Sequence, residues 1–166
     1  MVVKDALKQA ETILNNADIE SFHADSLILL CYVLGITKEK YILIKDNEIS
    51  NKDSERYFKL IEKRSKNYPV KYITGRCEFM GIDFKVCDGV LIPRPETEIL
   101  VEKAISLFGK YENIEVCDIC CGSGCIGLSV ISFLKNAQLT SYDISDTAVN
   151  ITTENYSGEV EILSSK

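Results

Sequence analysis

The chain has 166 residues, of which 46% are hydrophobic and 27% are charged. This composition is typical of a folded globular protein with one domain or two small ones, and it excludes an intrinsically disordered chain. Because no apolar run is long enough to span a bilayer and the N-terminus lacks a signal-peptide pattern, we predict a cytoplasmic protein without a membrane partner.

The net charge of −6 is unevenly distributed along the chain. Residues 1–95 carry a net charge of +1, whereas residues 96–166 carry a net charge of −7. Binding to a nucleic-acid backbone usually requires a basic face. We therefore expect no direct contact between the acidic C-terminal part and nucleic acid.

The first 68 residues have the pattern of a small bundle of helices. Apolar side chains recur at helical spacing over residues 4–15, and a second predicted helix extends from a capping Ser21 to Leu34 before Gly35. This second helix is apolar over most of its circumference, so we expect it at the centre of the bundle. The single histidine, His23, lies at its start, where we expect a capping or surface role.

Two further helical patterns cover residues 38–44 and 54–66, and Phe58, Leu60 and Ile61 are expected to face inward. Basic side chains are frequent from the second of these helices onward. The basic segment, as we call it, consists of Arg56, Lys59, Lys63, Arg64, Lys66, Lys71 and Arg76. These residues form either a solvated face or a docking surface for an acidic or nucleic-acid-bearing partner.

Residues 69–93 are predicted to link two domains. From Val70 onward apolar side chains alternate with polar ones, and the alternation is interrupted at Gly81. A period of two is typical of strands, and the interruption indicates a turn. We therefore predict a β-hairpin linker.

The C-terminal domain is predicted to cover residues 94–166. The two prolines of the segment Pro93–Thr97 fix the backbone ahead of a helix, and the acids that follow suit its N-terminus. This helix is predicted to end near Phe108, before Gly109. Its expected buried residues are Leu100, Ala104, Leu107 and Phe108.

Strand and helix patterns then alternate. A strand ends at Asp118, a helix extends to about Lys135, a second strand covers 138–142, a helix begins after Ser145, and a third strand covers 160–163. This β-α-β-α-β order predicts an α/β fold with a parallel sheet and right-handed crossovers.

A glycine loop joins the first of these strands to its helix. Gly122, Gly124 and Gly127 allow a tight turn and a close approach to a ligand at the helix N-terminus. Asp143, 21 positions beyond Gly122, is where a ribose hydroxyl pair requires a carboxylate. Asp118 favours the cationic S-adenosylmethionine over a nicotinamide dinucleotide, whose pyrophosphate it would repel.

Four of the seven cysteines crowd into this region: Cys117, Cys120, Cys121 and Cys125. Structural zinc requires four well-spaced ligands, and the chain has neither a second Cys-x-x-Cys pair nor a second histidine. We therefore interpret these thiols as reduced, small packing residues rather than as a metal site.

Three motifs, in this order and spacing, resemble those of the release factor glutamine methyltransferases: LIPRPETEILVEKAI, VCDICCGSGCIGLSV and SYDISDTAVNITTEN. The segment KYITGRCEFMGIDFKVCDGVLIPRPET resembles the hairpin and linker of that family, and DSLILLCYVLG resembles its helical N-terminal domain. The resemblance covers essentially the whole chain. PRPET makes it far more specific than the glycine pattern alone.

The resemblance implies a fold, an activity and a partner. In that family a helical N-terminal domain docks peptide chain release factors. A Rossmann-like domain of the same enzymes methylates the glutamine side-chain amide in the Gly-Gly-Gln loop of these factors. S-adenosyl-L-methionine is the implied cofactor, and no metal is implied. The implied cofactor-binding residues are Asp118, Cys120, Cys121, Gly122, Ser123, Gly124 and Asp143, and Pro95–Thr97 border the site.

The sequence departs from the family pattern in two ways. Cys120 stands where glycine is common, and its Cβ crowds the loop if the position requires a positive φ. The family's catalytic Asn-Pro-Pro-Tyr motif is absent, because all three prolines precede the glycine loop. We therefore expect an N-terminal fragment with an incomplete sheet, uncovered apolar faces and no catalytic residues. The alternatives are a non-catalytic binding module and a nicotinamide-dinucleotide-binding protein.

Overall fold

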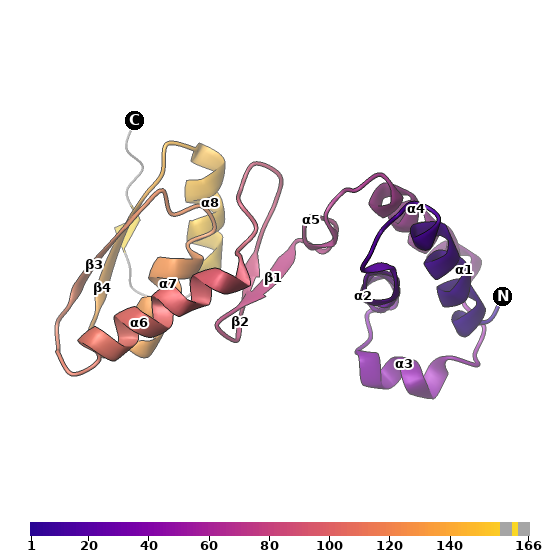
Figure 1. Ribbon diagram of the computed structural model, residues 1–166, viewed down its shortest axis with the longest axis horizontal. Coiled ribbons are helices and arrows are strands. Elements are labelled where there is room, and N and C mark those ends of the chain that lie inside the picture. Colours follow the sequence, from indigo (N-terminus) through magenta and orange to yellow (C-terminus); the bar gives the residue numbers. More distant parts are fainter. Residues whose placement is uncertain (157–160, 163–166) are drawn as a thin grey trace. The chain divides into compact units, whose positions relative to one another are not determined.

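Helices are the main elements of the N-terminal part of the chain, where one isolated antiparallel bridge joins Val2 to Glu48 (Figure 1). The computed structural model describes residues 1–156 and 161–162. The chain divides into two units, Met1–Thr74 and Gly75–Lys166, which we call the helical unit and the α/β unit. The helices of the first unit are α1 (Val3–Asn15), α2 (Phe22–Leu34), α3 (Lys38–Ile44), α4 (Asn51–Ser65) and α5 (Val70–Thr74).

Helix α2 lies at the centre of the helical unit, as its apolar circumference predicted. It packs against α1, α3, α4 and α5, and Leu29 and Leu30 are fully buried. Gly35 ends the helix in the left-handed conformation with φ +63°, which glycine adopts without steric cost. The expected cap is wrong, because the Ser21 hydroxyl donates to the Asp25 carboxylate at 2.6 Å and caps no backbone N–H.

Helix α4 begins at Asn51, earlier than predicted, because Ser50 caps it. The Ser50 hydroxyl accepts a hydrogen bond from the backbone N–H of Asp53 at 3.1 Å. Ile61 is fully buried, as expected, and so is Tyr57, whose hydroxyl donates to the carbonyl of Ser26 at 2.9 Å. Phe58 and Leu60 are only half-buried and pack at the margin of this core.

The expected strand from Val70 is wrong, because Val70–Thr74 forms the short helix α5. The carbonyl of Pro69 accepts hydrogen bonds from the N–H groups of Tyr72 and Ile73, and the Thr74 hydroxyl donates back to Val70. Val70 and Ile73, three residues apart, both pack against the helical core. Tertiary packing therefore overrides the alternating pattern, and the helical unit extends past residue 68.

The α/β unit opens with a β-hairpin, which confirms the predicted turn at Gly81. Strand β1 (Arg76–Phe79) pairs antiparallel with β2 (Ile82–Lys85), and Phe79 lies opposite Ile82. Met80 and Gly81 have φ values of +53° and +72°, the two left-handed residues that a tight type I′ turn requires.

A parallel sheet follows, as the β-α-β-α-β pattern predicted. Its strands are β3 (Glu115–Ile119), β4 (Gln138–Tyr142) and β5 (Glu161–Ile162), paired in this order. The crossover helices are α7 (Cys125–Phe133) and α8 (Asp146–Asn155). Val160 and Leu163, the first and last residues of the predicted third strand, lie outside the described residues.

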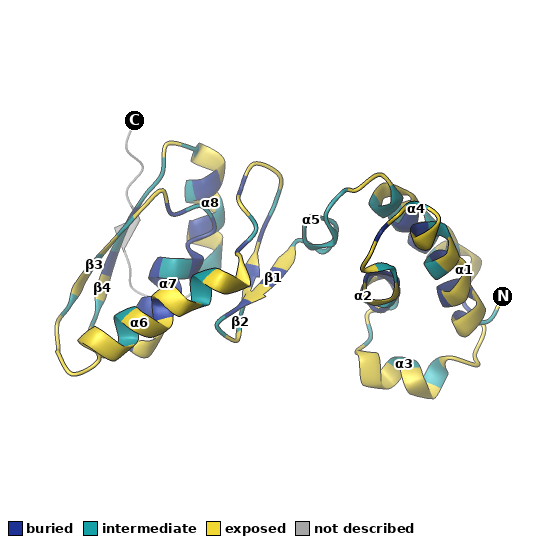
Figure 2. Cartoon of the chain, in the orientation of Figure 1, coloured by how far each residue is buried: buried dark blue, intermediate teal, exposed yellow. Residues whose placement is uncertain are grey.

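Helix α6 (Glu98–Phe108) follows a short 3-10 turn, Pro95–Thr97, and only part of its prediction is confirmed. It ends before Gly109, but Leu100, Leu107 and Phe108 are 47–56% exposed instead of buried. Val101 is the one fully buried residue of this helix, and it belongs to the hydrophobic cluster that includes Phe79, Leu128 and Leu139. In Figure 2 most of α6 has the colour of exposed residues. The helix therefore leaves most of its apolar side uncovered.

None of the helices in the described part of the chain combines the length and the apolar character that crossing a bilayer requires.

Candidate cofactor-binding site

The glycine loop, residues 120–124, connects β3 to α7 through three left-handed residues. Cys120, Gly122 and Gly124 have φ values of +64°, +59° and +75°. A Cβ at Gly124 would lie 2.7 Å from the Thr152 side chain, so conformation and space both require glycine there. Cys120 has a positive φ, which is the condition under which its Cβ was expected to crowd the loop. For a residue with a Cβ this left-handed conformation costs about 1–2 kcal/mol.

Hydrogen bonds attach this loop to the ends of the sheet. The N–H of Cys121 donates to the carbonyl of Tyr142 at 3.0 Å, and the N–H of Gly122 donates to the Asp143 carboxylate at 2.9 Å. The other Asp143 oxygen accepts from the N–H of Ser145 at 2.9 Å, and Ser145 caps α8 as predicted. The structure therefore brings Asp143 and the glycine loop together.

Asp118 supports the loop from the side of helix α7. Its carboxylate accepts a hydrogen bond from the N–H of Gly127 at 3.1 Å, and a Cβ at Gly127 would lie 2.8 Å from the same oxygen. Burial raises the pKa of Asp118, the Gly127 hydrogen bond lowers it, and the nearby charge of Asp143 raises it. This carboxylate is thus occupied by the helix backbone.

A cavity of about 110 Å³ lies between the glycine loop and the proline-rich segment. Its lining includes Pro93, Arg94 and Thr97 on one side and Cys120, Gly122 and Ser123 on the other. A Cβ at Gly122 would meet no atom within 4 Å, so the loop backbone is open to a ligand there. Arg94, an exposed residue of this lining, offers a cation for a ligand carboxylate.

The residues of this cavity fit one end of a nucleoside-type cofactor. Pockets that enclose a whole drug-sized ligand measure roughly 300–1,000 Å³, so the described residues build part of such a site. The open backbone at Gly122 and the hydrogen-bonded carboxylate of Asp143 are the features that suit a ribose-bearing cofactor.

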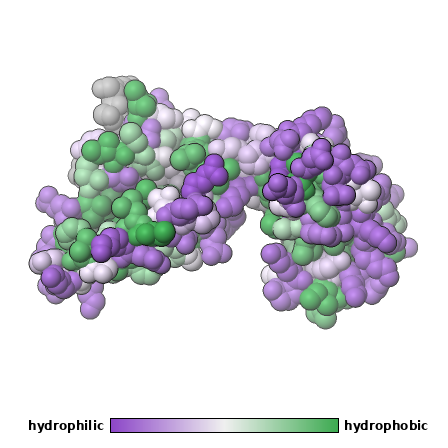
Figure 3. All heavy atoms as spheres, in the orientation of Figure 1, coloured by the Kyte–Doolittle hydropathy of each residue, from purple (hydrophilic) through white to green (hydrophobic). Residues whose placement is uncertain are grey.

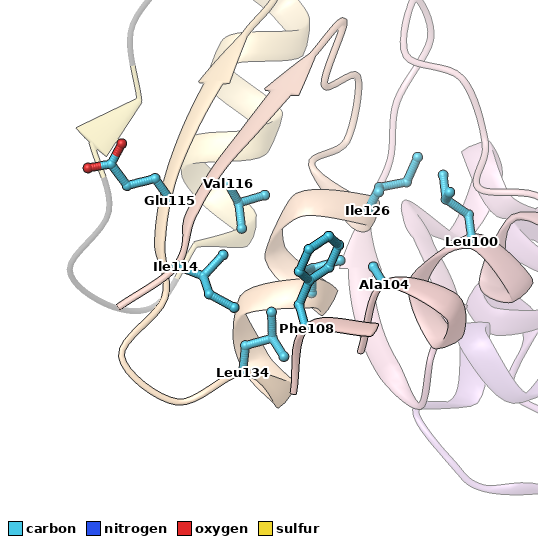
Figure 4. A pocket seen from close by; sticks show the side chains of 9 residues that line it. Leu100, Ala104, Phe108, Ile114, Glu115, Val116, Ile126 and Leu134 are labelled. Carbon is cyan, nitrogen blue, oxygen red and sulfur yellow. The ribbon is translucent and has the colours of Figure 1, made fainter. Parts of the chain in front are cut away.

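A larger cavity of about 310 Å³ lies among α6, β3 and α7 (Figure 4). The side chains of Leu100, Phe108, Val116 and Leu134 are among those that line it, and the carboxylate of Glu115 points away from them. It contains none of the predicted site residues. An apolar hollow without convergent polar groups can be covered by other apolar side chains, but it offers nothing to orient a cofactor.

The clustered cysteines are all free thiols. Cys117 and Cys120 are exposed, whereas Cys121 and Cys125 are buried, and burial raises the pKa of both buried thiols. Among residues 1–156 and 161–162, no group of three or more His, Cys, Asp and Glu residues could hold a metal ion. His23 lies on the surface, 2.9 Å from the Glu11 carboxylate.

Sequence reasoning missed two side chains that contact the glycine loop, Thr152 and Asn155 of α8. The Thr152 hydroxyl donates to the carbonyl of Gly122 at 3.0 Å, and the Asn155 amide donates to the carbonyl of Ser123 at 2.9 Å. Their only signal in the sequence is a spacing of three residues, which places them on one face of a helix.

Parallel strands, a glycine loop ahead of a helix and an acid after the next strand define a Rossmann-like cofactor-binding domain. Comparison with known families specifies its class, because residues 96–162 match the methyltransferase small domain. Residues 5–75 match the PrmC N-terminal domain. The α/β unit is therefore of the methyltransferase class.

Individual relatives narrow the class to a family. The chain is 43% identical to the release factor glutamine methyltransferase of Clostridium acetobutylicum, over 95% of this chain and 55% of that protein. It is 41% identical to that of Clostridium botulinum, over 93% of this chain and 55% of that protein. For the enzyme of Thermodesulfovibrio yellowstonii these values are 38%, 90% and 53%. The chain belongs to the release factor glutamine methyltransferase family, and it spans about half the length of the curated relatives it matches.

Proposed function

We propose that this chain supplies the donor loop and the docking domain of an enzyme that methylates release factors. The reaction transfers a methyl group from S-adenosylmethionine to the glutamine side-chain amide of the Gly-Gly-Gln loop. The observation that carries the proposal is the glycine loop, held by Asp143 and open at Gly122. The relatives and the two matched domains support the acceptor and the release factor partner.

In this proposal each part of the site has a separate task. Asp143 would accept hydrogen bonds from the donor's ribose hydroxyls, and residues 120–124 would hold its methionine side. Asp118 acts through the backbone of α7, to which it is hydrogen-bonded. When bound, S-adenosylmethionine supplies an electrophilic methyl group. The protein contributes mainly by positioning the reacting groups.

The catalytic Asn-Pro-Pro-Tyr motif does not occur among the 166 residues. We therefore propose that this chain by itself binds the donor weakly and transfers no methyl group. The cytoplasmic location expected from the sequence also stays a prediction.

Equilibrium dialysis with labelled S-adenosylmethionine and labelled NAD tests the cofactor. We expect the chain to retain S-adenosylmethionine and not NAD. We expect Asp143→Ala to abolish the retention of S-adenosylmethionine. Asp146→Ala is the matched control, since Asp146 is an exposed acid in the same region. Preferential retention of NAD would overturn the proposal. Methylation of a release factor by residues 1–166 alone would contradict the assignment of catalysis to residues that this chain lacks.

The alternative function is a non-catalytic module that docks a partner through the basic segment, and the structure does not favour it. Within that segment Arg64 is paired with Asp25, Lys66 with Glu62 and Arg76 with Asp83. Lys63 lies over the ring of Tyr68, with its Nζ 3.7 Å from the ring centroid. The carboxylates of Asp25, Glu62 and Asp83 thus offset part of the positive charge of this segment. Reversal of Lys59 and Lys63 to Glu, followed by a pull-down with a release factor, tests this: lost binding would restore the docking interpretation.

A further inference from the structure

We propose that Thr152 and Asn155 are positioning residues that hold the glycine loop in the conformation that binds the methyl donor. They act through the loop backbone and touch no reacting atom. The identity of the ligand rests on the proposed function above, whereas the positioning of the loop rests on hydrogen bonds of this chain alone.

Thr152 is a fully buried polar residue in the middle of α8. Its hydroxyl proton has two acceptors within reach, the carbonyl oxygen of Gly122 at 3.0 Å and the sulfur of Cys121 at 3.3 Å. A carbonyl oxygen is the stronger acceptor of the two. The Thr152 side chain also fills the space that a Cβ at Gly124 would need. One side chain thus fixes both the polarity and the shape of the inner side of the loop.

Asn155 joins the glycine loop to the β-hairpin. Its amide nitrogen donates to the carbonyls of Ser123 and Lys85, both at 2.9 Å, and its oxygen accepts from the Lys85 N–H at 2.6 Å. Both amide protons and the oxygen are therefore used, and the Lys85 N–H fixes which way the amide faces. This network ties loop, helix and strand β2 into one body.

The two hydrogen bonds also determine where a loop N–H points. The C=O and N–H of a trans peptide point in opposite directions, and no peptide among the described residues is cis. Because the Gly122 carbonyl faces α8, the N–H of Ser123 faces away from α8. Ser123 lines the cavity, and its N–H donates to none of the described residues. Thr152 thereby leaves a backbone donor available to a ligand carboxylate.

Loss of these hydrogen bonds affects binding through the fraction of molecules whose loop is in the binding conformation. The apparent affinity for a ligand is the intrinsic affinity multiplied by that fraction. Losing one such hydrogen bond and leaving the part-buried Gly122 carbonyl without its donor changes an equilibrium by about tenfold. We therefore expect about tenfold weaker donor binding without the Thr152 hydroxyl.

The test compares Thr152→Val, which removes the hydroxyl at constant shape, with Thr152→Ser, which keeps it. Thr153→Val is the matched control, because the Thr153 hydroxyl bonds only within its own helix, to Val149. Asn155→Asp is a second variant, which keeps the acceptor for Lys85 and loses both donated bonds. Each is made in the full 166-residue chain.

Hydrogen exchange is the first readout and needs no ligand. We expect the amides of Gly122 and Gly124 to exchange about tenfold faster in Thr152→Val and Asn155→Asp, with β3 and β4 unchanged. Thr153→Val should match the natural chain. Thr152→Ser keeps the hydroxyl but lacks the methyl group beside Gly124, so it should accelerate these amides less than Thr152→Val does. Unchanged loop amides, or equal acceleration throughout the α/β unit, would overturn the positioning role.

Equilibrium dialysis with S-adenosylmethionine is the second readout. We expect Thr152→Val to bind about tenfold more weakly than the natural chain, and Thr152→Ser to bind more tightly than Thr152→Val. If loop exchange changes as expected but the natural chain retains no S-adenosylmethionine, the proposed function fails and the positioning of the loop stands. If the donor binds equally to all variants, the positioning role is wrong and the proposed function stands.

Discussion

The two units of this chain differ in how completely they bury their apolar side chains. In the helical unit α2 is enclosed by its neighbours, and Leu14, Leu29, Leu30, Tyr57 and Ile61 are fully buried. In the α/β unit Ile99, Leu100, Leu107, Phe108 and Ile119 are all at least 47% exposed. Figure 3 shows apolar residues gathered on the α/β unit, whereas the visible face of the helical unit is mostly hydrophilic.

Within the described residues the helical unit therefore covers its apolar side chains more fully than the α/β unit does. A helix bundle closes its core with its own helices, whereas a parallel sheet is stable only with both faces covered. Among the described strands β3 lies at an edge, beside the apolar hollow of Figure 4. The uncovered apolar faces expected from the sequence are therefore present, and the glycine loop belongs to this incompletely covered unit.

The largest expected effect contrasts a buried leucine with an exposed one. Leu30→Ala, in the enclosed helix α2, should lower the free energy of unfolding of the helical unit by about 2–5 kcal/mol, since it leaves a cavity. Leu107→Ala, on the half-exposed side of α6, should cost less than about 1 kcal/mol. Urea unfolding followed by hydrogen exchange of each unit measures both. Equal losses would refute the contrast between the two units.

A buried ion pair in the helical unit gives the next largest effect. Arg64 and Asp25 are 2.8 Å apart, with side chains only 15% and 11% exposed. Arg64→Met should destabilise the unit by about 3 kcal/mol, because Asp25 is left buried without its partner. Lys66→Met removes an ion pair to Glu62 in which both side chains are more than two-thirds exposed, and it should cost less than about 0.5 kcal/mol. Thermal unfolding of the two variants side by side decides whether burial makes the difference.

A third prediction concerns strain in the α/β unit. Cys120→Gly should stabilise this unit by about 1 kcal/mol, because glycine adopts a φ of +64° without the clash of a Cβ. The same substitution at Cys117, in strand β3, should destabilise it by roughly 0.5–1 kcal/mol through lost backbone rigidity. Opposite signs in chemical denaturation are the expected result. Destabilisation at both positions would show that the left-handed conformation of Cys120 is not strained.

The smallest effect is a dependence on pH. Burial raises the pKa of Asp118 in the folded chain above its unfolded value, so its contribution to stability is present at low pH and lost as pH rises through the folded pKa. Asp118→Asn keeps an acceptor for the Gly127 N–H but cannot ionise. The stability of this variant relative to the natural chain should therefore increase as pH rises through that range. Unfolding free energies at several pH values, with Glu112→Gln as the reference for an exposed carboxylate, measure it.

Much of the fold was predictable from local patterns. Helices α1 to α4, the turn at Gly81 and the alternation from β3 onward follow from apolar periodicity, glycines and caps, which act over a few residues. The strand predicted for Val70–Thr74 was wrong, because the alternating pattern of this segment resembles that of a strand. In the structure Val70 and Ile73 pack on the helical core as one face of a helix. The predicted burial of Leu100 and Leu107 was wrong, because an apolar stripe shows which side of a helix can be buried but not whether a neighbouring element covers that side.

The candidate site divides in the same way. The spacing of Gly122, Gly124 and Asp143 predicted a loop and a carboxylate that the structure joins by a hydrogen bond. Thr152 and Asn155 carry no comparable signal, because their role depends on α8 returning beside a loop some thirty residues earlier in the chain.

The sequence by itself determined the order of the elements (except α5), the glycine loop and the family, because turns, caps and motifs are encoded within short segments. Only the tertiary structure decided which apolar faces are covered, that Arg64 is buried against Asp25, and that α8 holds the loop carbonyls. Each of these features joins segments that are distant in the sequence. The two polar contacts form because a buried polar group needs a hydrogen-bond partner, and that partner can come from any segment that the fold brings within reach.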